Sequence, residues 1–173
     1  MIPAPKLGWM AGIVDLKGRL VYKNNKTRAT PQVVLTVESK EYPVIKALGV
    51  LTGTRAEYRR AQPLKEFMRR ACADHCPEAH VHVADEREMP QVARWTITGA
   101  GMVVVLSNLM PYLTVDRGYE QAMEQVRQNT VLEGQGSGMV FMSLQRLQSL
   151  DWELPDDYAQ ALRDHLGEEQ KPE

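Results

Sequence analysis

The segment from Met10 to Gly18 constrains the fold more than any other part of this sequence. It reads Met-Ala-Gly-Ile-Val-Asp-Leu-Lys-Gly. Residues 7–14 fit a short apolar helix, Asp15 opens an Asp-x-x-Gly turn, and residues 19–23 fit a strand. The small residues Gly8, Ala11 and Gly12 would let another helix approach this one closely. We therefore expect a packed helix that leads almost directly into a sheet.

The rest of the pattern predicts an α+β fold with an antiparallel sheet covered on one face by helices, in the order α-β-β-α-β-β-α. Expected strands cover residues 19–23, 32–39, 81–83 and 92–98. Expected helices cover residues 7–14, 41–51, 63–73, 100–110, 119–128, 139–150 and 157–166. We expect one domain over 1–128 with an insert around 55–80, a packed C-terminal helical extension over 129–166, and a tail over 167–173.

The charge distribution of the chain is strongly asymmetric. Residues 1–70 carry 14 Lys or Arg and 5 Asp or Glu, a net charge of +9, whereas residues 71–173 carry 7 and 17, a net charge of −10. Such asymmetry indicates a basic face that binds a polyanion, because Lys17, Arg19, Lys23, Lys26 and Arg28 fall in one short span. The alternative is that the two halves interleave in space and neutralise each other.

Three segments together resemble the LAGLIDADG homing endonucleases. The first is Met10–Gly18, the second is Thr96–Ala100, where a strand runs into an apolar helix, and the third is Leu109–Leu113, a proline-aromatic-leucine step before a further helix. In that family two signature helices pack through small residues and the sheets bind DNA in its major groove. A single signature in this chain implies a homodimer on double-stranded DNA, with Gly8, Ala11 and Gly12 at the dimer interface.

The resemblance also indicates which side chains would bind DNA. Long polar side chains at alternate strand positions suit contacts with phosphates and base edges. Together with the basic cluster, the predicted DNA-binding set is Lys17, Arg19, Lys23, Asn25, Lys26, Arg28, Gln32, Thr36, Arg94 and Thr96. The alternative is that these residues form the solvated face of an ordinary sheet.

Two departures from the family pattern argue against DNA cleavage. Where the family carries the acidic residue that holds its catalytic metal, this chain has Lys17, and an ammonium group cannot bind Mg²⁺. Asp116 stands near the place where the resemblance implies a lysine. Asp15 remains as an acid, and would be catalytic, with Mg²⁺, only if the protein is an active nuclease. Its other expected role is to cap the turn.

A separate cluster of soft ligands lies in the expected insert. Cys72 and Cys76 share a helix face, and His80 and His82 share a strand face, so these four residues could bind a structural Zn²⁺; His75 could replace one of them. The alternatives are histidines that face solvent or DNA without metal, buried cysteines that act as small hydrophobes, or a disulfide.

The sequence therefore predicts a DNA-binding protein of LAGLIDADG type without nuclease activity. The alternatives are an active metal-dependent homing endonuclease and a protein-interaction module that reuses the fold. The longest apolar run, Met102–Leu106, is too short to cross a bilayer, and the N-terminus lacks the pattern of a signal peptide. We expect a cytoplasmic protein with no membrane partner.

Overall fold

The computed structural model describes residues 1–23, 31–54, 56–59, 92–132 and 137–169. Within them, α1 (Ala4–Lys17) leads into β1 (Gly18–Lys23), β2 (Gln32–Ser39), α2 (Tyr42–Thr52), β3 (Glu57–Arg59) and β4 (Val92–Thr98). The chain continues with α4 (Gly99–Leu109), the 3₁₀ turn η1 (Met110–Tyr112), α5 (Tyr119–Leu132), α6 (Ser137–Ser149) and α7 (Asp156–Glu169).

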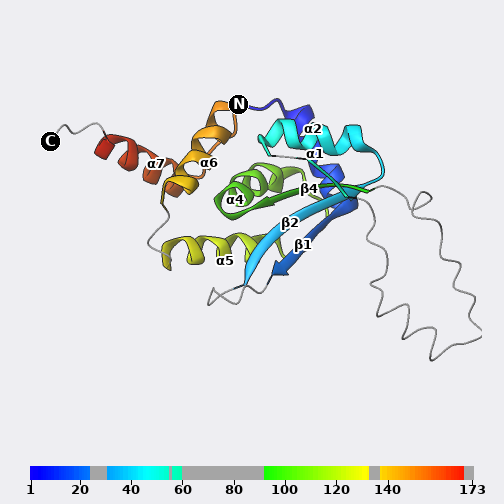
Figure 1. Cartoon of the computed structure of the whole chain (residues 1–173), viewed down its shortest axis with the longest axis horizontal. Helices are drawn as coiled ribbons and strands as arrows, with labels where there is room; N and C mark the ends of the chain where they lie inside the picture. The colour runs from blue at the N-terminus through cyan, green and yellow to red at the C-terminus, as the bar shows by residue number, and fades with distance from the viewer. Residues whose placement is uncertain (24–30, 55, 60–91, 133–136, 170–173) are drawn as a thin grey trace, which may run out of the picture.

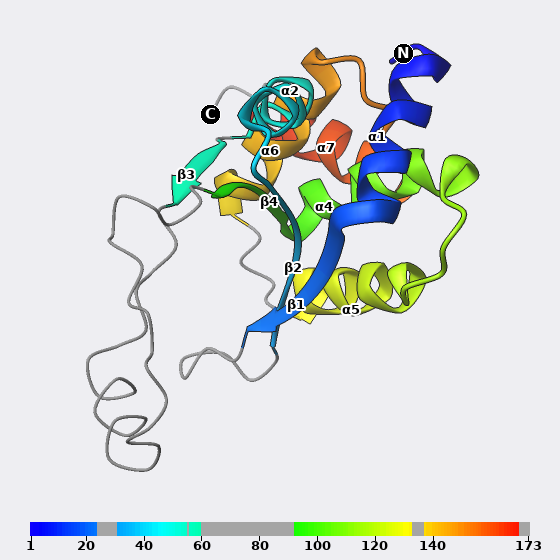
Figure 2. The same cartoon turned by 90° about the vertical axis from the view of Figure 1, so that its right-hand side faces the viewer.

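The sheet is antiparallel and its strand order is β1-β2-β4-β3 (Figure 1). Because side chains alternate along a strand, one face carries Val33, Leu35 and Val37 of β2 with Trp95 and Ile97 of β4, all in the main hydrophobic core. Figure 2 shows α1, α4 and α5 on one side of the sheet. The opposite side, called the open face below, holds the alternate residues of β1, β2 and β4.

Helix α1 and strand β1 meet without an intervening turn. The buried residues Leu7, Met10, Ala11 and Val14 follow the helical period. The helix ends at Lys17, and Gly18 is already extended with φ −71° and ψ 142°. A Cβ at Gly18 would lie 2.4 Å from the carbonyl oxygen of Val14, so only glycine fits this sharp change of direction.

The C-terminal helices add to the same core. Leu144, Leu147 and Trp152 are nearly fully buried in it, and the indole Nε1 of Trp152 donates a hydrogen bond of 2.8 Å to the carbonyl oxygen of Leu51 at the end of α2. The segment between α6 and α7 is thus joined to α2 by a hydrogen bond across 101 positions of the chain.

The structure corrects several predicted boundaries. Helix α1 is longer at both ends than the expected 7–14, and α5 ends at Leu132 where the expected helix ended at 128. Helix α7 continues to Glu169, beyond the expected end at 166. β4 pairs with β3, which lies inside the expected insert. The helix expected over 63–73 and the strand expected over 81–83 lie outside the described residues.

Candidate nucleic-acid interface

The open face presents rows of polar side chains that are aligned across the strands. The register places Arg19 beside Thr36 and Thr36 beside Thr96, and it places Lys23 beside Gln32. Arg19 and Lys23 are exposed, whereas Gln32 and Thr96 are partly exposed. The alternation predicted from the sequence therefore brings six of the ten predicted DNA-binding residues, Arg94 included, onto one face. Asn25, Lys26 and Arg28 lie outside the described residues.

Thr36 is the least exposed of the predicted DNA-binding residues on this face. It lies on the open face, in the middle of a row, but its side chain is only 9% exposed. Its hydroxyl is therefore poorly placed for the DNA contact that its position in the sequence suggests.

Next along the open face, Arg94 forms an ion pair with Glu38 on the adjacent strand. The register puts Glu57 of β3 on the other side of Arg94. Arg94 is therefore a cation flanked by two carboxylates, unlike the exposed Arg19 and Lys23.

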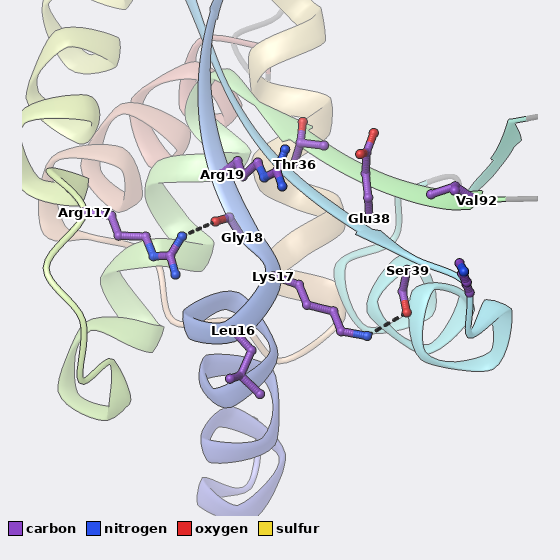
Figure 3. Close-up of a pocket in the computed structure, with 10 residues that line it drawn as sticks. Leu16, Lys17, Gly18, Arg19, Thr36, Glu38, Ser39, Val92 and Arg117 are labelled. Atoms are coloured by element: carbon purple, nitrogen blue, oxygen red, sulfur yellow. Dashed lines mark hydrogen bonds between the residues drawn. The ribbon is translucent and has the colours of Figure 1, made fainter. Parts of the chain in front are cut away.

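A pocket opens where α1 ends and β1 begins (Figure 3). Four basic side chains line it, from Lys17, Arg19, Lys40 and Arg117, together with one carboxylate, that of Glu38. The Nζ of Lys17 donates a hydrogen bond of 2.9 Å to the hydroxyl oxygen of Ser39, a buried residue at the end of β2. Lys17 is thereby held at the pocket, and the pocket carries an excess of positive charge.

Arg117 is a site residue that the sequence reasoning missed. Its Nη1 donates a hydrogen bond of 2.9 Å to the carbonyl oxygen of Gly18, and its Nη2 donates one to that of Asp15. Its neighbour Asp116 instead accepts a 2.8 Å hydrogen bond from the backbone N–H of Gly118 at the start of α5. The cation that lines the pocket is therefore Arg117, and Asp116 does not place a negative charge among the lining residues. In the sequence, the signal that could have identified Arg117 was its position next to Asp116.

Asp15 ties α1 to the segment that precedes α5. Its Oδ2 accepts hydrogen bonds of 2.8 Å from both the backbone N–H and the hydroxyl of Thr114, and its Oδ1 accepts one of 3.4 Å from the N–H of Val115. Burial alone would raise the pKa of Asp15, but these hydrogen bonds and the charge of Arg117 outweigh it, so the pKa lies below its ordinary value. Asp15 therefore bridges two segments and does not cap a turn.

The residues at this pocket do not fit Mg²⁺. Hard divalent cations take several oxygen ligands, mainly carboxylates. Here Lys17 supplies an ammonium group, Glu38 is paired with Arg94, and both oxygens of Asp15 accept hydrogen bonds from Thr114 and Val115. Over the described ranges, no three His, Cys, Asp or Glu residues are grouped so as to hold a metal ion.

The predicted zinc ligands are not among the described residues. Cys72, Cys76, His80 and His82, together with His75, fall outside the described residues. The structural zinc site stays a prediction from the sequence, and elemental analysis of the purified protein would test it.

The outward side of α1 is apolar and exposed. Leu16 is 80% exposed and Trp9 is 42% exposed, and a Cβ added at Gly12 would meet no atom within 4 Å. Ala11, which we expected at a dimer interface, is fully buried in the core of the chain. A Cβ added at Gly8 would lie 4.0 Å from Cδ1 of the Tyr112 ring. The exposed stripe therefore consists of Trp9, Gly12 and Leu16.

Comparisons with known proteins agree with the predicted fold. Sequence comparison finds no matching family model and no matching curated protein. The structure is similar to the homing endonuclease I-CvuI, solved in complex with its target in the presence of Ca, with a TM-score of 0.50 and 13% identity over 92% of this chain and 94% of that one. A double mutant of I-SmaMI gives a TM-score of 0.44 and 10% identity over 90% of this chain and 47% of that one.

None of the helices in the described part of the chain is long and apolar enough to cross a membrane. Two observations support the predicted fold class. The sheet is antiparallel with helices packed on it, and the structure is similar to that of I-CvuI. The chain has the LAGLIDADG-type fold that the sequence predicted.

Proposed function

We propose that this protein is a homodimer that binds double-stranded DNA on the open face of its sheet and does not cleave it. The observation that carries the proposal is the basic pocket at the end of α1, where Lys17 stands beside Arg19, Lys40 and Arg117. The fold shared with a homing endonuclease that was solved with its DNA target supports the choice of nucleic acid as the polyanion.

Phosphate is the chemical group that suits this pocket. A lysine ammonium and an arginine guanidinium both bind phosphate oxygens, and each contact releases counterions from the duplex. Arg19 and Lys23 continue the positive charge along β1 on the same face. A backbone that passes along β1 would meet cations at the pocket, which includes Arg19, and then Lys23 four positions further along the strand.

The same residues favour binding without hydrolysis. Metal-dependent cleavage requires carboxylates that hold a divalent cation near the scissile phosphate. An ammonium group at position 17 repels such a cation and attracts the phosphate itself. The carboxylate of Asp15 stabilises the contact between α1 and Thr114, so its role in this proposal is structural.

A second copy of the chain is the proposed partner of the exposed stripe on α1. Trp9, Gly12 and Leu16 lie three or four residues apart, so they form one apolar ridge on the helix. Gly12 would allow the two helices to approach closely. Pairing of the stripes across a two-fold axis would bring the two pockets, at the ends of the two helices, onto one side of the dimer.

Fluorescence anisotropy with a labelled random-sequence duplex tests the proposal at low salt. We expect wild-type protein to bind, and Lys17→Glu and Arg19→Glu each to weaken binding by about tenfold or more, because each removes a phosphate contact and adds a repulsive charge. Lys46→Glu is the matched control, since Lys46 is an exposed lysine of α2 that does not line the pocket at the end of α1.

A plasmid cleavage assay with Mg²⁺ or Mn²⁺ completes the test. Intact plasmid at protein concentrations that saturate binding agrees with the proposal, whereas staggered cuts would favour the active endonuclease. Absence of binding by wild-type protein at low salt would reject a DNA-binding function and leave the protein-interaction module.

A further inference from the structure

We propose that Arg94 reads a guanine base in the bound DNA and that Glu38 positions its guanidinium for this contact. The inference rests on the DNA-binding function proposed above. It concerns the row of the open face formed by Glu38 of β2, Arg94 of β4 and Glu57 of β3, which lie side by side in the register of the sheet.

The geometry of the ion pair leaves the recognition edge of Arg94 available. Both Nε and Nη2 of Arg94 contact the same oxygen, Oε1 of Glu38. These two atoms form the inner edge of the guanidinium. The outer edge, made by Nη1 and the second N–H of Nη2, carries two parallel donors that Glu38 does not use. That fork matches the O6 and N7 acceptors of guanine in the major groove.

The charges around Arg94 favour a base over a phosphate. Two carboxylates flank one guanidinium in this row, so its formal charge is −1. A phosphate here would be repelled by both carboxylates, whereas the acceptor edge of guanine carries no formal charge. Arg19, by contrast, has the uncharged Thr36 beside it and suits a phosphate.

The partial burial of Arg94 and Glu38 favours a specific contact with the base. The side chains of Arg94 and Glu38 are 30% and 37% exposed, so the strands on either side limit their freedom. An arginine held by a carboxylate loses less conformational entropy when it binds than a free one. Glu38 is therefore a positioning residue, and Arg94 makes the contact.

Selection of bound duplexes from a randomised pool, followed by sequencing, tests the inference. Wild-type protein should select guanine at one position of each half-site. Arg94→Lys should remove this preference, a loss of roughly 5- to 150-fold in discrimination at that position. It keeps the positive charge beside Glu38, so the variant should remain folded, which a thermal melt would check. Glu38→Ala should weaken the preference, and Glu38→Gln should restore part of it.

The salt dependence of affinity separates base reading from phosphate binding. Arg94→Ala should leave the slope of log K against log salt unchanged, whereas Arg19→Ala, the matched control, should reduce it by about 1 per contact. An unchanged guanine preference in Arg94→Lys, or a reduced slope in Arg94→Ala, would overturn the inference while DNA binding stands. Failure of the wild-type protein to bind any duplex would overturn the proposed function, and this inference with it.

Discussion

Replacement of Asp15 by asparagine tests whether this carboxylate stabilises the fold. The charged group accepts two hydrogen bonds of 2.8 Å and one of 3.4 Å from Thr114 and Val115. Hydrogen bonds to a charged group contribute about 1.5–3 kcal/mol each when well formed, but these are solvent-accessible and asparagine keeps one acceptor oxygen. We therefore expect Asp15→Asn to lower the free energy of unfolding by about 1–2 kcal/mol.

Thermal unfolding followed by circular dichroism at pH 7 measures the effect. For a chain of this length, that loss corresponds to a decrease in Tm of about 2–8 °C. Asp164→Asn is the matched control, because Asp164 is an exposed residue of α7 that accepts one side-chain hydrogen bond from Gln160. The control should change Tm by less than about 2 °C.

The pH dependence of stability tests the same role of Asp15. The pKa of Asp15 lies below its ordinary value of 3.8 in the folded protein, so its ionised form is favoured by folding. Its contribution is fully present above that ordinary value and is lost as the pH falls through the lower pKa of the folded state. The difference between wild type and Asp15→Asn should therefore shrink below about pH 4. An asparagine variant that is as stable as wild type at pH 7, or more stable, would refute the structural role.

Three further substitutions test the dimer and the packing. Leu16→Glu should convert the dimer to monomer in analytical ultracentrifugation while Tm of the monomer stays near that of the wild-type subunit, because Leu16 is 80% exposed; a wild-type monomer would contradict the proposed interface. Gly53→Ala should cost about 1–2 kcal/mol in urea unfolding, because Gly53 has φ +63°, whereas Gly167→Ala on α7 should not destabilise. Trp95→Phe should cost about 1–3 kcal/mol, since the buried indole donates to the hydroxyls of Thr52 and Thr54; equal stability would show that these bonds contribute nothing.

The elements that sequence reasoning identified are those with strong local signals. The alternation of Val33, Leu35 and Val37 in β2 predicts a buried face, and all three residues are buried in the core, although Val34 and Thr36 on the other face are buried as well. Pro43 in the first turn of α2 and Gly53 at its end bound that helix, which runs close to the expected 41–51. β3 was missed because three residues are too few to show any alternation.

The details of the site depended on contacts between distant parts of the chain. Asp15 and Arg117 are 102 positions apart, and no local pattern indicates that the guanidinium bonds to the end of α1. Ala11 and Gly12 are adjacent small residues, and only the packed structure shows that one is buried and the other exposed. Thr36 follows the strand period of the DNA-binding set, yet it is only 9% exposed.

The salt dependence of DNA affinity tests the central claim most directly. With Lys17, Arg19 and Lys23 of both subunits on phosphates, the slope of log K against log salt should be about −5, and Lys17→Ala should reduce it by nearly 2 because each subunit loses one contact. Plasmid in the same buffer with Mg²⁺ should remain intact. Binding with a slope near zero, or a Lys17→Ala variant with the wild-type slope, would contradict the account.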